Sequence, residues 1–188
     1  FRSVLSLLSS AAHPVITDSG QLVIGDKYLR QAGTSMAAPH VAGVAALIRS
    51  LHPEFGPEQV RQAIRFGADD VDAIGFDTNS GYGRINAAKS LTVSMPLVAR
   101  LNGPLEPITD TCMVPVDGSV GGTGLSTWRL EFGAGTNPAS WTQITSSGTP
   151  ISNGQLANWN ISNVADGTYT LRLIAQNTSG QLFEDRLS

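Results

Sequence analysis

Hydrophobic and polar positions in the first half of the chain alternate between short apolar runs and helical patterns. Residues 1–8 are partly apolar and are followed by turn-like residues, which indicates a buried strand. Residues 21–30 are typical of two short strands separated by the turn pair Gly25-Asp26. Residues 41–48, Val-Ala-Gly-Val-Ala-Ala-Leu-Ile, are apolar on every side of a helix. We therefore expect a core helix there that other structure covers on nearly every face.

Two further helices are predicted in the middle of the chain. Pro57 suits the first position of a helix whose apolar residues recur at helical spacing, and Gly67 ends it. Asn86 is a suitable cap for a last short helix that runs to about Leu91. Both helices are interpreted as structural.

The second half of the chain loses helical periodicity and becomes richer in glycine, serine, threonine and asparagine. Pro96, Pro104 and Pro107 indicate a linker over residues 94–107. Short strand candidates then recur between turn residues, which is typical of an antiparallel β-sandwich. The predicted strands are Cys112–Val116, Leu125–Phe132, Trp141–Ile144, Leu156–Ile161, Thr168–Gln176 and Gln181–Leu187.

The composition is that of ordinary globular material, and it excludes several classes of partner. A net charge of −3 and a pI near 5.5 provide no basic surface, so nucleic acid is not expected as a partner. No apolar stretch approaches the roughly eighteen residues of a membrane span. The single cysteine, Cys112, excludes a disulfide within the sequence.

The candidate chemistry lies in the sequence GTSMAAPHVAG at residues 33–43. Gly33 permits a close approach of the backbone to a ligand, and Thr34 or Ser35 can cap the helix that follows. The first amides of a helix have no carbonyl partner inside it, and they lie at the positive end of the helix dipole. A serine hydroxyl there sits where the oxyanion of an acyl-transfer reaction can be stabilised.

This sequence resembles the nucleophile motif of the subtilisin family of serine proteases. Residues 80–88 resemble the segment that closes the catalytic domain of that family. The resemblance covers residues 1–93 and implies an α/β fold, the C-terminal part of a subtilisin-like parallel-sheet domain. We expect the linker, residues 94–107, to follow it. A separate antiparallel sandwich, residues 108–188, looks like immunoglobulin or fibronectin-like modules and is expected to be truncated at its end.

The resemblance implies a secreted serine endopeptidase with a protein or peptide substrate, acting through an acyl-enzyme. Ser35 is expected to attack the carbonyl carbon, and its own backbone N–H to contribute to the oxyanion hole. Gly33 and Thr34 are expected to border the substrate cleft. The family's catalytic aspartate and histidine motifs are absent from this sequence. We therefore expect a fragment with negligible activity on its own.

A serine hydroxyl needs a general base, and two of the three histidines are excluded by helix geometry. His40 lies five residues after Ser35, and at about 100° per residue it turns away from the serine. His52 lies roughly 25 Å farther along a continuous helix. His13 stays open as a local base. The carboxylates that could orient it are those of Asp18 and Asp26.

Four aspartates lie close together after the second helix. Clustered carboxylate oxygens suit calcium, but their spacing fits no binding-loop pattern. A calcium site and a solvated acidic loop both stay open; otherwise we expect no metal or cofactor. The four residues are Asp69, Asp70, Asp72 and Asp77.

Three tryptophans in the second half, Trp128, Trp141 and Trp159, permit two interpretations. They can fill the core of the sandwich, or they can form a platform that stacks on sugars of a glycan or cell surface. The second interpretation gives an alternative function, a carbohydrate- or surface-binding protein with a vestigial protease portion. The retained glycine, serine and proline of residues 33–43 argue against an abandoned site.

Overall fold

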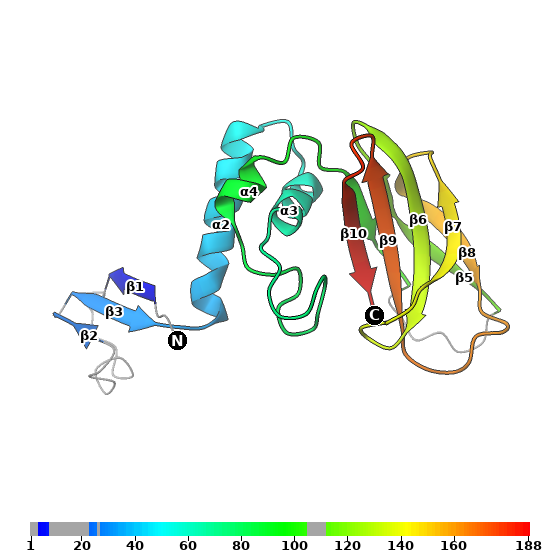
Figure 1. Cartoon of the computed structure of the whole chain (residues 1–188), viewed down its shortest axis with the longest axis horizontal. Helices are drawn as coiled ribbons and strands as arrows, with labels where there is room; N and C mark the ends of the chain where they lie inside the picture. Colours follow the sequence, from blue (N-terminus) through cyan, green and yellow to red (C-terminus); the bar gives the residue numbers. More distant parts are fainter. Residues whose placement is uncertain (1–3, 8–22, 26, 105–111) are drawn as a thin grey trace. The chain divides into compact units, whose positions relative to one another are not determined.

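The computed structural model describes residues 4–7, 23–25, 27–104 and 112–188 (Figure 1). The chain divides into two compact units, residues 1–46 and residues 47–188, and each is described by itself. Helix α2 (Thr34–Leu51) begins in the first unit and ends in the second.

The first unit contains a small antiparallel sheet with the strand order β1-β3-β2. Strands β2 (Val23–Ile24) and β3 (Tyr28–Gln31) are the two short strands predicted in this region. Gly25 follows β2 with a φ of +55°, a left-handed conformation that glycine adopts readily.

Strand β1 (Val4–Leu7) confirms that a strand lies near the start of the chain, but the expected burial is wrong, since Leu5 and Leu7 are 52% and 80% exposed. Its pairing is antiparallel, with β3. The expected parallel sheet has no counterpart among the described strands, whose pairings are all antiparallel. In the first unit β3 pairs with both β1 and β2 and runs opposite to each of them, so this sheet contains no parallel pair among its described strands.

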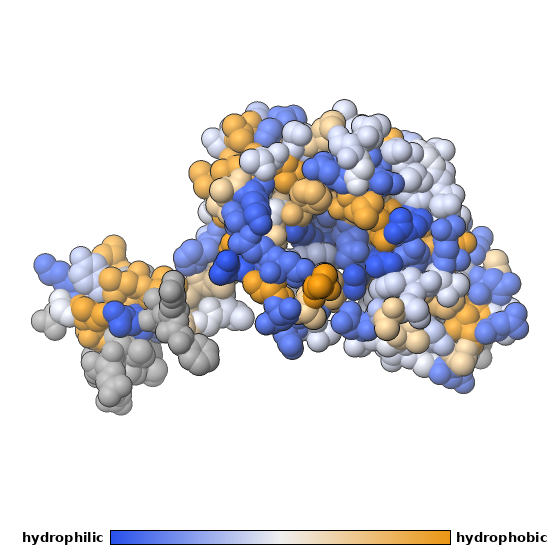
Figure 2. Space-filling model, in the orientation of Figure 1, coloured by the Kyte–Doolittle hydropathy of each residue, from blue (hydrophilic) through white to orange (hydrophobic). Residues whose placement is uncertain are grey.

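Helix α2 confirms the predicted helix, but the expected cover is incomplete. Val44 and Ile48, one turn apart, are buried, whereas Val41, Leu47 and Leu51 are 42%, 52% and 58% exposed. Figure 2 shows hydrophobic side chains at the surface over the end of α2 that is uppermost in Figure 1. The described residues therefore cover this apolar helix along one row of side chains.

The second unit contains two antiparallel sheets that lie against each other in two layers, here called the sheet pair (Figure 1). One sheet has the order β10-β9-β6-β7 and the other the order β4-β5-β8. Leu130, Leu173 and Val116 are fully buried in its core, where the ring centroids of Phe132 on β6 and Trp159 on β8 lie 4.8 Å apart. The strands are β4 (Val98–Leu101), β5 (Met113–Gly121), β6 (Leu125–Ala134), β7 (Thr142–Ser147), β8 (Ile151–Asn160), β9 (Tyr169–Asn177) and β10 (Leu182–Leu187).

The six strands predicted beyond residue 111 are all present, as β5 to β10, with shifted ends. Strand β4, which the sequence interpretation did not include, lies within residues 94–107 and pairs with β5. The prolines on either side suggested a linker. Pro96 and Pro104 lie outside β4, however, so neither removes an amide from its ladder.

The two predicted helices of the second unit are confirmed. Helix α3 (Pro57–Phe66) starts with proline and ends at Gly67. Helix α4 (Ala87–Leu91) is capped by the side chain of Asn86, which accepts the N–H of Lys89 at 3.1 Å. Both helices belong to the same compact unit as the sheet pair.

Candidate active site

Helix α2 begins within the stretch that carries Ser35. Gly33 precedes the helix with a φ of +151°, which residues with a side chain rarely adopt. A Cβ atom on Gly33 would meet no atom within 4 Å, so backbone conformation rather than crowding favours glycine. The Gly33 carbonyl accepts the N–H groups of Met36 and Ala37 at 3.0 and 3.1 Å. These bonds close the first turn of α2 around Ser35.

The side chain of Ser35 is exposed, and no hydrogen bond joins it to another described residue. The backbone N–H groups of Thr34 and Ser35 have no carbonyl partner among the described residues. The first turn also contains no acidic side chain, so nothing in it neutralises the positive end of the helix dipole. A negative oxygen can therefore be stabilised beside this hydroxyl. The sequence analysis did not use the absence of an acidic residue from this turn, although the sequence after Ser35 shows it directly.

Pro39 and His40 determine what lies one turn beyond Ser35. Proline has no N–H, so it cannot donate to the Ser35 carbonyl, yet α2 continues past it. The imidazole of His40 turns back along the helix, with its Nδ1 2.8 Å from the carbonyl oxygen of Met36. His40 therefore has a partner on its own helix, and its position along the helix already predicts that it does not serve Ser35 as a base.

His52 lies beyond the other end of α2 and has local partners. Its Nδ1 is 3.2 Å from Oε1 of Glu54, and its ring stacks on Phe55 with centroids 4.4 Å apart. Seventeen residues of helix separate it from Ser35, a rise of about 25 Å. The third histidine, His13, and its expected partners Asp18 and Asp26 lie outside the described residues. Gly33, Thr34 and Ser35 lie at the start of α2, and no histidine among the described residues is hydrogen-bonded to Ser35.

Residues 13–83, which include the whole stretch around Ser35, match the subtilase family. Over these residues the chain is similar to the subtilisin-like serine proteases. The match ends before strand β4, the first strand of the sheet pair.

Individual relatives with similar sequences include proteases. An extracellular serine protease of Serratia marcescens is 33% identical over 89 residues, which are 47% of this chain and 8% of the relative. A calcium-dependent protease of Nostoc sp. is 34% identical over 140 residues, 68% of this chain and 20% of the relative. Fervidolysin of Fervidobacterium pennivorans is 38% identical over 72 residues, 38% of this chain and 10% of the relative. The chain therefore spans a fifth or less of the length of these relatives.

Asp69, in the aspartate-rich segment of this subtilisin-like part, is paired with cations. Its carboxylate lies 2.6 Å from Nζ of Lys89 and 3.2 Å from Arg84, and it accepts from the Asn86 amide. Hydrogen bonds from Lys89 above all, and then from Asn86 and Arg84, lower the pKa of Asp69 to about 2. Its oxygens are therefore engaged by protein groups.

Two other aspartates of the segment, Asp77 and Asp70, close local turns. The Asp77 carboxylate accepts the N–H groups of Asn79 and Ser80 at 2.7 and 2.8 Å and the Ser80 hydroxyl at 2.6 Å. Asp70 accepts the N–H of Gly75 at 2.8 Å. Within the described ranges, no three acidic, histidine or cysteine side chains converge as metal ligands. The aspartates as placed do not fit a calcium site.

The three tryptophans form no shared platform. Trp128 is 2% exposed and donates to the Thr149 carbonyl at 2.7 Å, and Trp159 is 6% exposed. Trp141 is half-buried, and the Arg172 guanidinium lies 3.9 Å from its ring centroid. This placement favours a structural role and does not support the glycan-binding alternative. No helix in the described part of the chain is long and apolar enough to span a membrane.

The carboxylate of Asp69 is expected to titrate near pH 2, because Lys89, Asn86 and Arg84 favour its charged form. Since its folded pKa lies below the unfolded value, the stabilisation from this pairing is present above about pH 4 and is lost as the pH falls through 2. Carbon-13 NMR of the side-chain carboxyl measures the midpoint. In Lys89→Ala the midpoint should move towards 3.8. An unshifted midpoint in the parent chain would contradict the ion pairs.

Proposed function

We propose that this chain carries the nucleophile of a subtilisin-like serine endopeptidase. The observation that carries the proposal is the exposed Ser35 hydroxyl in the first turn of α2, beside amides without described carbonyl partners. The surrounding sequence is similar to the subtilisin-like serine proteases. The substrate class is therefore protein or peptide.

In the proposed reaction, the Oγ atom of Ser35 attacks the carbonyl carbon of a peptide bond and its proton passes to a general base. The tetrahedral oxyanion receives a hydrogen bond from the Ser35 backbone N–H, and Gly33 and Thr34 border the cleft. The C–N bond then breaks, the amine takes the proton from the base, and an acyl ester remains on Ser35. Water, deprotonated by the same base, hydrolyses the ester and regenerates the hydroxyl.

The base and its orienting carboxylate are proposed to lie outside the described residues. His13 with Asp18 or Asp26 is one source, and other residues of the same gene product are another. His40 and His52 do not qualify, because each has a local partner and the helix directs both away from Ser35.

Several properties of the relatives are extended to this chain as proposals. Secretion is supported by the name of the Serratia relative, an extracellular serine protease. Calcium dependence is supported by the name of the Nostoc relative, but residues 69–77 do not provide the ligands. We also propose that residues 1–93 are part of a subtilisin-like parallel-sheet domain, which the family match over residues 13–83 supports. Residues 108–188 are proposed to form an immunoglobulin or fibronectin-like sandwich, which the two antiparallel sheets support.

Ser35→Ala in the longest polypeptide that the gene encodes should lower the rate of casein hydrolysis by at least about 1,000-fold, because no other group replaces the nucleophile. The fold should persist, since the hydroxyl has no described partner. Ser50→Ala is the matched control, an exposed serine of the same helix, and should leave the rate unchanged. Equal rates for the parent and Ser35→Ala would overturn the proposal.

The chain of residues 1–188 alone should react slowly with a fluorophosphonate, because no described base accepts the Ser35 proton. The measurement is intact-mass spectrometry over time, with Ser35→Ala as the blank. Rapid labelling that requires Ser35 would show that a base lies within the chain. Loss of that labelling in His13→Ala would then identify His13 as the base.

A further inference from the structure

The polar face of α3 lies against one edge strand of each sheet in the sheet pair. Strand β4 is the edge of one sheet and β10 is the edge of the other. Backbone groups at a sheet edge have no neighbouring strand, so when they are covered they need other partners. Side chains of α3 supply these partners along one row of the helix.

Gln62 occupies the centre of this contact and is 1% exposed. Its amide nitrogen lies 3.0 Å from the Ala99 carbonyl of β4 and 3.1 Å from the Glu184 carbonyl of β10. Arg61 also donates to the Ala99 carbonyl, at 3.2 Å, and Arg65 to the Glu184 carbonyl, at 3.2 Å. Three side chains of α3, those of Arg61, Gln62 and Arg65, thus donate to carbonyls of both β4 and β10.

Asp185 of β10 completes the contact from the opposite side and is 7% exposed. Its Oδ1 accepts from Arg61 at 2.9 Å and from Arg65 at 3.0 Å, and its Oδ2 accepts the Leu101 N–H of β4 at 2.9 Å. Burial alone would raise the pKa of Asp185, but these donors outweigh it and lower the pKa. One carboxylate therefore joins helix, first sheet and second sheet.

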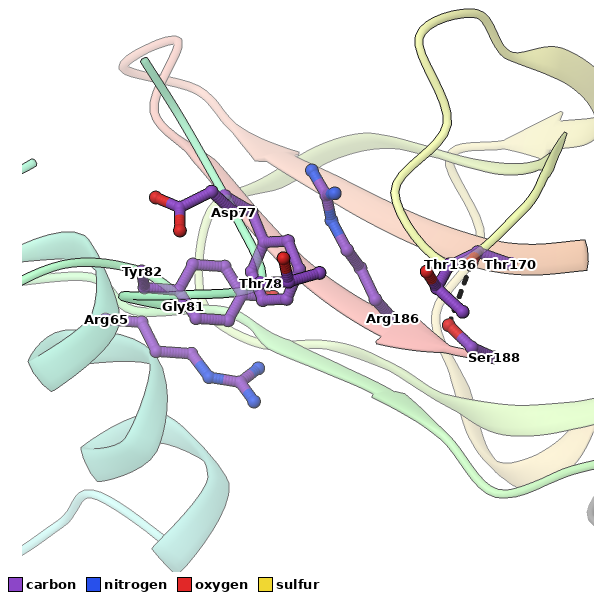
Figure 3. A pocket seen from close by; sticks show the side chains of 10 residues that line it. Arg65, Asp77, Thr78, Gly81, Tyr82, Thr136, Thr170, Arg186 and Ser188 are labelled. Atoms are coloured by element: carbon purple, nitrogen blue, oxygen red, sulfur yellow. Dashed lines mark hydrogen bonds between the residues drawn. The ribbon is translucent and has the colours of Figure 1, made fainter. Parts of the chain in front are cut away.

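The loop between α3 and α4 adds a second contact with β10. The Arg186 guanidinium lies 4.5 Å from the Phe76 ring centroid, and the Arg65 guanidinium lies 4.4 Å from that of Tyr82. These four residues line a cavity of about 370 Å³ whose opposite wall belongs to the sheet pair (Figure 3). The subtilisin-like stretch thus meets the sheets through both α3 and this loop.

We propose that the sheet pair is the permanent intramolecular partner of α3 and stabilises the end of the protease part, instead of acting as a module on a flexible linker. Residues 57–104 and 112–188 then unfold together. The edges of the sheets are closed by a helix from the subtilisin-like sequence, and the polar face of that helix is buried only while the sheets are folded. The proposal goes beyond the protease function and does not depend on the catalytic role of Ser35.

Native-state hydrogen exchange on the whole chain tests this coupling. Leu130→Ala removes buried volume from β6, two strands away from β10 in its sheet. The expected result is that the slowest amides of α3 lose protection by the same factor as those of β6 and β9, at least about 30-fold. Unchanged protection in α3 while β6 and β9 lose theirs would overturn the proposal. Leu130→Val serves if Leu130→Ala does not fold, with a smaller common factor.

A second pair of variants tests the contact itself. Asp185→Asn leaves two arginines without their buried anion, so protection should fall in both α3 and β10. Asp117→Asn changes an exposed aspartate on β5 and should alter neither. If Asp185→Asn changes exchange as little as Asp117→Asn, the contact does not couple the helix to the sheets.

Discussion

The carboxylate of Asp185 joins three elements of the second unit, because this side chain of β10 bonds to α3 and to β4. It is buried between two guanidinium groups of α3 and a backbone amide of β4. A buried ion pair gains little net stability, because desolvation offsets most of the attraction, but removing one partner leaves an uncompensated charge. This asymmetry penalises every docking position of α3 except the one that satisfies all three donors. The rest of the unit, including α4 and the loop before it, follows from where α3 is fixed.

Ser35 is exposed, whereas Asp185 is buried, and the proposed chemistry requires an exposed hydroxyl. A nucleophile has to be reachable by substrate, and this hydroxyl is exposed at a helix start and positioned by backbone hydrogen bonds to Gly33. Its neighbours provide electrostatic stabilisation through amides, which need no titration. The described neighbours of Ser35 provide no histidine as proton acceptor, because His40 contacts the Met36 carbonyl and His52 contacts Glu54. The proposed activation of the serine therefore requires groups beyond the described residues.

Local patterns predicted the local structure well. Apolar spacing, Pro57, Gly67 and Asn86 identified α3 and α4, and alternation with turn residues identified six strands. Strand β4 was missed because flanking prolines resemble a linker. The contact between α3 and β10 was also missed, since Gln62 and Glu184 lie 122 positions apart and nothing local distinguishes Asp185 from a surface aspartate. The motif singles out Ser35 as the nucleophile, which stays a prediction, and it does not identify a general base.

Mass-spectrometric mapping of a covalent adduct tests the central assignment most directly. The longest polypeptide that the gene encodes is treated with a fluorophosphonate, digested, and sequenced by tandem fragmentation. An adduct on Ser35 and on no other serine is the predicted result, because the Ser35 hydroxyl is exposed and lies beside the proposed oxyanion amides. An adduct on a different serine, with Ser35 unmodified in an active preparation, would contradict the assignment.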